Sequence, residues 1–394
     1  MKRLILCILL LGILLPAPAR RYPFVRTDKS RIQYPAGISP EYDIFLRKLD
    51  TLLLTGGGDV RVLHMGGSHV QGGSFPDRLR RRFLSLRYGI EGGRGLVFPF
   101  SAAGTNTPSS YSSSWQGKWE GATCLKPGDA TLGATGMAVI TRDTSARVAI
   151  DLLSKEPRLL QQHYAFSKVD LLGEGTLEPY LLIHGRDTVW GVKGREVVHF
   201  DLPYYTDWLQ LAFTGEGQYT VRGIYLDRPT TGFTLCEAGV NGATTHAWLR
   251  CPLLAQDLRR VRPDLVIFSI GINDIQGADF DVRRFKANYR ALIKEVREAN
   301  PRCAILFTGI NDSWRKRAVN EHTAQVQEAL RELAAEYKAV FWDWFEVMGG
   351  AGSMAQWMDA GLAQSDKVHF TPAGYQLVAD LLFDAIMADY YQHR

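Results

Sequence analysis

Three residues in two distant stretches of the chain could act together on a carbonyl group. Ser68 follows the apolar run that begins at Val60 and two glycines, so we expect it just beyond the end of a strand. Asp366 precedes His369 by three residues, in a loop before a helix. This spacing lets the carboxylate reach one imidazole nitrogen and leaves the other free to face a serine. The three residue types would supply a nucleophile, a base and a group that orients the base.

Two further features could hold the negative charge that develops on such a carbonyl. Asn273 lies in the motif GIND after the predicted strand 264–271, where its amide can donate a hydrogen bond at a sheet edge. Gly242 lies in the glycine-rich loop GVNGATT, which can offer a backbone N–H. The nucleophile elbow G-x-S-x-G is excluded, because Val70 occupies its second glycine position.

Two histidines near Ser68 are alternatives for the base. His69 adjoins the serine, but adjacent side chains at a turn usually diverge, so we interpret it as a turn or substrate-rim residue. His64 lies within the predicted strand, and we interpret it as a hydrogen-bonded core histidine.

The elements that must position these residues alternate between strands and helices. The parts 41–83 and 234–394 combine short apolar runs with amphipathic stretches, which predicts βαβ units and a parallel sheet covered on both faces. The stretch 75–83 is predicted to be the helix after Ser68, with its arginines forming a solvated face. The other predicted helices are 41–54, 283–300, 322–338 and 372–391, and the later strands are 264–271, 303–309 and 339–344. Thr371 and Pro372 fit the N-cap and the first residue of the last helix.

The middle of the chain, from about Gly95 to Arg228, has a different pattern. Short alternating runs are separated by Gly, Pro, Asp and Thr, which favours an antiparallel sandwich of roughly 130 residues inserted into the α/β domain. The polar stretch 101–119 is predicted to be a loop near the junction. The predicted strands are 137–143, 146–153, 180–185, 197–202, 208–213 and 219–226.

The first residues, MKRLILCILLLGILLPAPAR, predict a secretory signal peptide over 1–19, with an uncleaved anchor as the alternative. The apolar run is short of the about 20 residues that a membrane span needs, so we expect export to the periplasm or the extracellular space and no stable span after cleavage. The net charge of +5 includes Lys2 and Arg3. The mature charge, +5 − 2 = +3, is too mild to favour a nucleic-acid partner.

Export would permit disulfide bonds among the four remaining cysteines, and both one bridge and free buried thiols stay open. Their spacing gives no zinc pattern, and the sequence has no H-E-x-x-H, Walker A or G-x-G-x-x-G motif. We therefore expect no metal and no organic cofactor. These cysteines are Cys124, Cys236, Cys251 and Cys303.

In this order along the chain, the candidate residues resemble sequence blocks of the GDSL or SGNH hydrolase family. Ser68 matches the block I serine, Gly242 the block II glycine, Asn273 the block III asparagine, and Asp366 with His369 the block V pair. The resemblance implies a flavodoxin-like three-layer α/β fold with a parallel sheet. It also implies that the serine attacks an ester, that the histidine is base and then acid, and that the aspartate orients it. The N–H groups of the serine and the glycine and the asparagine amide would form the oxyanion hole.

The sequence departs from the family pattern at Gly67, where an acidic residue usually precedes the serine. This departure leaves the predicted fold intact but puts the activity in doubt, so a non-catalytic glycan-binding protein remains an alternative. A second GIND motif makes Asn311 a rival of Asn273. Asn273 is preferred because it has the family's lead-in, RPDLVIFSIGIND, and follows the glycine-rich loop directly.

A β domain inserted after block I resembles the bacterial peptidoglycan O-acetylesterases, in which that domain is a jelly roll similar to carbohydrate-binding modules. The segment 92–106 is similar to the one that leads into their insertion. The resemblance implies a secreted serine esterase that removes acetyl groups from an O-acetylated glycan, foremost peptidoglycan. An O-acetyltransferase or an acetylxylan-type esterase remains an alternative, and the oligomeric state is open. The predicted parts are the signal peptide 1–19, the hydrolase domain 20–94 and 231–394, and the inserted domain 95–230.

Overall fold

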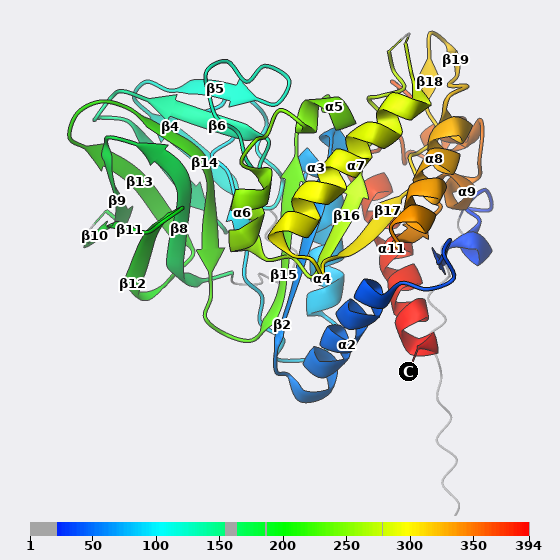
Figure 1. Cartoon of the computed structure of the whole chain (residues 1–394), viewed down its shortest axis with the longest axis horizontal. Coiled ribbons are helices and arrows are strands. Elements are labelled where there is room, and N and C mark those ends of the chain that lie inside the picture. Colours follow the sequence, from blue (N-terminus) through cyan, green and yellow to red (C-terminus); the bar gives the residue numbers. More distant parts are fainter. Residues whose placement is uncertain (1–21, 154–163, 186, 278, 394) are drawn as a thin grey trace, which may run out of the picture.

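A computed structural model describes residues 22–153, 164–185, 187–277 and 279–393. The predicted signal peptide over 1–19 lies outside the described residues. Figure 1 shows a sheet flanked by helices beside a region of antiparallel strands. No helix within the described ranges is long and apolar enough to cross a membrane.

The α/β part is built on a six-stranded sheet in which five neighbouring strands run parallel. The carboxyl ends of these strands meet at one edge, where open α/β folds bind ligands. The short strand β1 (Ile32–Gln33) pairs antiparallel with the end strand and completes the sheet. In sheet order the parallel strands are β20 (Val340–Trp342), β17 (Ala304–Thr308), β16 (Leu265–Ser269), β2 (Asp59–Gly66) and β15 (Gly232–Gly239).

Helices cover both faces of this sheet. Figure 1 shows α7 and α8 on the near face, and α4 and α11 behind it. The three-layer α/β fold with a parallel sheet is therefore confirmed. The long helices are α2 (Pro40–Thr55), α4 (Ser74–Leu84), α6 (Leu254–Val261), α7 (Val282–Ala299), α8 (Thr323–Glu336) and α11 (Pro372–Gln392). The short ones are η1 (Thr27–Lys29), α3 (Ser68–Gln71), α5 (Thr245–Trp248), α9 (Trp344–Met348) and α10 (Ser353–Asp359).

The last helix begins where the sequence predicts. Thr371 is the N-cap of α11, its hydroxyl accepts a hydrogen bond from the N–H of Gly374 (3.2 Å), and Pro372 is the first helical residue. Proline lacks an N–H and has a fixed φ, so it fits this position without losing a hydrogen bond. The cap fixes where the loop that contains His369 must end.

Between the two α/β segments lie two antiparallel sheets, which confirms the predicted sandwich. One has the order β10-β9-β13-β7-β4, and the other has the order β11-β12-β8-β14-β6-β5 with β3 paired to β14. Their strands are β3 (Gly95–Val97), β4 (Ser112–Gln116), β5 (Glu120–Thr123), β6 (Met137–Thr141), β7 (Arg147–Asp151), β8 (Phe166–Gly175), β9 (Glu178–Ile183), β10 (Asp187–Trp190), β11 (Val192–Lys193), β12 (Val198–Thr206), β13 (Trp208–Thr214) and β14 (Tyr219–Asp227).

Six strands of the sandwich were not predicted from the sequence, namely β3, β4, β5, β8, β10 and β11. The stretch 101–119 was expected to be a loop, but it contains β4, an edge strand that pairs with β7. An edge strand needs few apolar residues, and the exposed β4 has the sequence SSSWQ. The strand β8 was not predicted, although it lies between β12 and β14. Its register shifts against both neighbours, so its sequence does not alternate cleanly.

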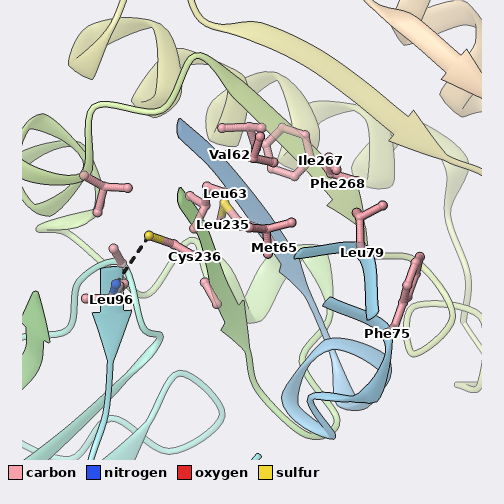
Figure 2. Packing of buried hydrophobic residues seen from close by; sticks show 14 of the residues in the cluster. Val62, Leu63, Met65, Phe75, Leu79, Leu96, Leu235, Cys236, Ile267 and Phe268 are labelled. Carbon is pink, nitrogen blue, oxygen red and sulfur yellow. Dashed lines mark hydrogen bonds between the residues drawn. The ribbon is translucent and has the colours of Figure 1, made fainter. Parts of the chain in front are cut away.

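The two parts of the molecule pack together along β15. Figure 2 shows Cys236 of β15 pointing toward Leu96 of β3, whose N–H donates to the sulfur (3.3 Å). A Cβ at Gly95 would lie 2.5 Å from that sulfur, so the chain can approach this closely only with glycine there. Cys236, Cys124, Cys251 and Cys303 are all free and buried. The sequence left open whether these cysteines form one disulfide bond or remain free thiols, and in the structure they are free thiols.

A buried ionic cluster also lies at this junction. The carboxylate of Glu237 on β15 accepts hydrogen bonds from Arg80 of α4 (3.2 Å), from Arg94 (2.5 Å) and from Ser110 (3.1 Å). Both arginine side chains are fully buried. The expectation that the arginines of α4 form a solvated face is therefore wrong for Arg80, which faces the core and also donates to the carbonyl of Leu235.

Candidate active site

Ser68 lies at the carboxyl edge of the parallel sheet, as the first residue of α3 directly after β2. The turn depends on glycine because the chain folds back tightly. A Cβ at Gly66 would lie 2.3 Å from the side chain of Val70, and a Cβ at Gly239 on the neighbouring strand would lie 2.2 Å from the N–H of Gln71. The glycines therefore let α3 begin immediately at the end of β2, which presents the serine hydroxyl at the edge.

The loop before α11 brings a histidine and an aspartate to this serine. The Oγ of Ser68 lies 2.7 Å from Nε2 of His369. The Nδ1 of that imidazole lies 2.7 Å from Oδ2 of Asp366. The structure thus brings together three residues that the sequence singled out, although 301 positions separate the serine from the histidine.

Asp366 is held in an ionised form by its own loop. Partial burial by itself would raise the pKa of the carboxyl, but hydrogen bonds from the N–H groups of His369 and Val368 and from the imidazole outweigh it and lower the pKa. Both N–H groups donate to Oδ1 at 2.9 Å. The side chains of Asp366 and His369 are 47% and 34% exposed, so they remain accessible from solvent.

Asn273 and Gly242 lie at the same edge. The amide of Asn273 donates to the carbonyl of Ala243 (3.0 Å), the residue that follows Gly242. Gly242 has a φ of +78°, a left-handed conformation that glycine adopts without strain. Asp274 joins the loop of Gly242 to the loop of Asn273. Its carboxylate accepts hydrogen bonds from the N–H and the hydroxyl of Thr245 (3.0 and 2.6 Å). Burial raises the pKa of Asp274 to about 6.

Gly67 stands where the resemblance leads one to expect an acid. A Cβ at this position would lie 2.9 Å from the amide nitrogen of Asn273. Contacts this short require a shift, and the amide is already fixed by its hydrogen bond to Ala243. In this chain the amide of Asn273 therefore packs directly against the backbone beside Ser68.

Two polar residues that the sequence did not single out support the Gly242 loop. Gln71 accepts from the N–H of Asn241 (2.7 Å) and donates to Thr105 (3.0 Å). Asn106 accepts from the side chain of Asn241 (2.6 Å). The two residues lie 35 positions apart, so only the proximity of Gln71 to Ser68 in the sequence could have indicated this role.

The structure corrects the interpretation of His69. It is buried rather than at a substrate rim, and its Nδ1 lies 2.6 Å from the hydroxyl of Tyr375 on α11. Its ring packs 5.4 Å from the ring of His369. Burial, with a smaller effect of His369, lowers the pKa of His69 to about 3.

His64 and Asn311, the other two alternatives from the sequence, are both buried. His64 is fully buried, with Nε2 2.8 Å from the hydroxyl of Ser269, which confirms a hydrogen-bonded core histidine. Burial lowers its pKa to about 3. Asn311 of the second GIND motif is buried, and its amide donates to the carbonyls of Asp312 (2.8 Å) and Val368 (3.0 Å). It thus supports the loop before His369.

Metal-ligating side chains do not gather into a group of three or more in the part of the chain that the structure describes.

Residues 204–377 match the GDSL-like Lipase/Acylhydrolase family. The predicted resemblance to GDSL hydrolases is confirmed. The match contains Gly242, Asn273, Asp366 and His369, whereas Ser68 lies before it. The family supports the predicted enzyme class, a carboxylic ester hydrolase of the GDSL type. A comparison with curated proteins gave no match.

Among solved structures, a peptidoglycan O-acetylesterase superposes with a TM-score of 0.76 at 24% identity, covering 92% of this chain and 99% of that one. This similarity shows that the chain shares the fold of that protein over both its α/β part and its antiparallel sheets. An acetyl xylan esterase, AlAXEase, is 21% identical and covers 39% of this chain and 81% of its own, with a TM-score of 0.33. Axe2, an acetylxylan esterase from Geobacillus stearothermophilus, is 20% identical, covers 39% and 73%, and has a TM-score of 0.32.

Proposed function

We propose that the protein is a secreted serine esterase that removes O-acetyl groups from a polysaccharide, foremost peptidoglycan. The observation that carries the proposal is the chain of two short contacts, 2.7 Å each, from Ser68 through His369 to Asp366. A hydroxyl, an imidazole and an ionised carboxylate in this order form a nucleophile, a base and an orienting group.

In the proposed reaction the Oγ of Ser68 attacks the acetyl carbonyl while Nε2 of His369 takes the hydroxyl proton. The carboxylate of Asp366 stabilises the imidazolium that forms. When the tetrahedral intermediate collapses, the ester bond breaks and the imidazolium gives its proton to the leaving sugar oxygen. Water, deprotonated by the same imidazole, then releases acetate from the acetyl-serine.

We assign the oxyanion hole to the N–H groups of Ser68 and Gly242 and the side-chain amide of Asn273. The left-handed turn at Gly242 supports this, because a β-carbon there would strain the loop that carries the N–H. The 3.0 Å bond to Ala243 leaves the second amide hydrogen of Asn273 available to a developing oxyanion. Fixed donors of this kind stabilise the transition state without reorganisation.

The architecture supports a glycan as the substrate. A peptidoglycan O-acetylesterase shares the fold over nearly the whole length of both chains, including the antiparallel sheets. We therefore propose that residues 95–230 are an inserted domain similar to carbohydrate-binding modules, between the hydrolase segments 20–94 and 231–394. A polymer outside the cytoplasm needs an exported enzyme, in agreement with the signal peptide expected over 1–19.

The test measures acetate release from O-acetylated peptidoglycan and from O-acetylated xylan by the wild type and Ser68→Ala. Ser85→Ala is the matched control, because Ser85 is exposed and its hydroxyl donates only to Arg82 of the same helix region. We expect faster release from peptidoglycan than from xylan by the wild type and the control, and no release by Ser68→Ala. Release that survives in Ser68→Ala would contradict the assignment of the nucleophile.

The same assay separates the alternatives. Acetylated sugar that forms when an acceptor glycan is supplied would identify an O-acetyltransferase. Faster release from xylan would identify an acetylxylan-type esterase. Glycan binding without release from any ester would identify a non-catalytic binding protein.

A further inference from the structure

A basic hairpin stands beside the loop that contains Asp366 and His369. It consists of β18 (Trp314–Arg315) and β19 (Ala318–Val319), joined by the two-residue turn Lys316–Arg317. Figure 1 shows β18 and β19 projecting at the upper edge of the α/β part, near α8. Lys316 and Arg317 are exposed, and Arg315 is partly exposed.

Hydrogen bonds attach this hairpin to both loops of the candidate site. The N–H of Trp314 donates to the carbonyl of Lys367 (3.1 Å), and the Lys367 ammonium lies 3.5 Å from the centre of the Trp314 ring. On the other side, Arg315 donates to the carbonyl of Gln276 (3.2 Å), and Asn320 donates to the carbonyl of Ile275 (3.0 Å). The hairpin is therefore held between the loop of His369 and the turn that begins at Asn273.

The backbone of the hairpin turn is unusual for its residues. Lys316 and Arg317 have φ values of +48° and +70°, and Lys367 has +57°. Two successive residues with positive φ form the turn that joins two-residue hairpins, and asparagine followed by glycine suits that turn best. Long cationic side chains in left-handed positions are uncommon and cost backbone energy, which points to a use for the charges.

The cations of the hairpin have no acidic partner within 4.0 Å among the residues that the structure describes. Within the described residues, none of Arg315, Lys316, Arg317 and Lys367 is among the ion pairs of 4.0 Å or less, whereas other surface cations are paired. Four positive charges beside the candidate site attract an anionic partner and raise its local concentration. Peptidoglycan with stem peptides carries carboxylates along the glycan, whereas an acetylated xylo-oligosaccharide is neutral.

We propose that this basic hairpin, Arg315–Arg317 together with Lys367, binds the carboxylates of peptide-bearing peptidoglycan and selects it over neutral acetylated glycans. The inference rests on the proposed esterase function. It specifies that the same site recognises its substrate by the carboxylates of the stem peptides. The planar guanidinium groups suit carboxylates, and the exposed Lys316 adds a point charge.

The test compares two double variants that lose the same charge from left-handed positions. Lys316→Asn/Arg317→Gly removes the hairpin charges and installs the residues that the turn favours, so the hairpin should stay folded. The control, Arg262→Asn/Lys338→Asn, acts on exposed residues with φ of +51° and +50° that precede β16 and β20, at the edge of the sheet opposite Ser68. Asparagine tolerates this conformation well.

The readout is kcat/KM on O-acetylated peptidoglycan fragments that keep their stem peptides, divided by kcat/KM on a neutral acetylated xylo-oligosaccharide. We expect the hairpin variant to lower this ratio on the order of 10-fold, mainly through KM on peptidoglycan, and to weaken its salt dependence. The control variant should keep the wild-type ratio. An unchanged ratio in the hairpin variant, or an equal loss in the control, would overturn the proposal.

A binding measurement keeps this inference separate from the proposed function. With Ser68→Ala as the background, the affinity for the same peptide-bearing fragments is measured with and without the hairpin substitutions. A fall on the order of 10-fold supports the basic hairpin even if no acetate is released by the wild type. Equal affinities would reject it even if the esterase activity is established.

Discussion

Two clusters of polar side chains, one at the edge of the parallel sheet and one at the junction of the two parts of the molecule, differ in their access to solvent. Ser68, His369 and Asp366 lie at the open sheet edge, and the histidine and aspartate are 34% and 47% exposed. Arg80, Arg94 and Glu237 lie at the junction of the two parts of the molecule, with exposures of 0%, 0% and 3%. Both clusters have short hydrogen bonds. Accessibility to solvent suits the first cluster for chemistry, whereas burial suits the second for holding the two parts together.

The largest expected effect is on activity at the exposed cluster. Ser68→Ala should lower kcat on a soluble acetyl ester on the order of 10⁶-fold, because the nucleophile of a triad is lost. Its midpoint of urea unfolding should stay close to that of the wild type, since only a partly exposed hydroxyl is removed. A large loss of stability in this variant would erase the contrast between the two clusters.

Asn273→Ala should also lower kcat, by about 10² to 10³-fold, the usual effect of losing one oxyanion-hole donor. KM should change much less, because the donor acts on charge that develops in the transition state. Asn311→Ala, at the second GIND motif, is the informative comparison. If it lowers kcat as strongly as Asn273→Ala while the protein remains as stable, the choice between the two motifs is wrong.

Glu237→Ala should instead lower the free energy of unfolding, by about 3 to 5 kcal/mol, because it removes a carboxylate from two buried guanidinium groups, of which Arg80 keeps Asp77 (2.8 Å) as a second partner. Glu336→Ala is the matched control. Glu336 also pairs with an arginine, Arg290, but its carboxylate side chain is 42% exposed. An exposed pair of this kind contributes about 0 to 1 kcal/mol. Chemical denaturation of both variants checks the difference.

The smallest expected effect is a change in pH dependence at the buried His64. Its folded pKa of about 3 lies below the ordinary value of 6.5, so the unfolded chain takes up a proton before the folded protein does. The stability that depends on the neutral ring is present above pH 6.5 and is lost as the pH falls toward 3.

His64→Gln keeps a donor near Ser269 but removes this titration. Between pH 7.5 and 5.5 the wild type should therefore lose about 1 kcal/mol more of its unfolding free energy than the variant. Equal losses, measured by urea unfolding at the two pH values, would show that burial does not lower the pKa of the ring.

The residues of the exposed cluster could be predicted from the sequence because each follows a strand or precedes a capped helix. Parallel strands end at one edge, so Ser68 and Asn273 must meet there, and the cap at Thr371 fixes the loop of His369. The α/β fold and the presence of an antiparallel sandwich followed from the same patterns. The polar edge strand β4 and the irregular strand β8 did not, because their residues do not alternate between apolar and polar.

The partners of the buried residues His69 and Arg80 could not be predicted, because they lie far away in the sequence. His69 is fixed by Tyr375, 306 positions later, and Arg80 by Glu237, 157 positions later. Neither pairing has a local pattern, and arginines on a helix are normally solvated. The contact between Gly67 and the amide of Asn273 is likewise a property of the folded turn.

The most direct test of the central claim is to label the protein with a fluorophosphonate, which reacts with activated serine hydroxyls, and to locate the adduct by peptide mass spectrometry. We predict one adduct per chain on Ser68, and loss of labelling in both Ser68→Ala and His369→Ala, because the hydroxyl is activated by the imidazole 2.7 Å away. A wild-type protein that is not labelled, or an adduct on another serine, would contradict the account.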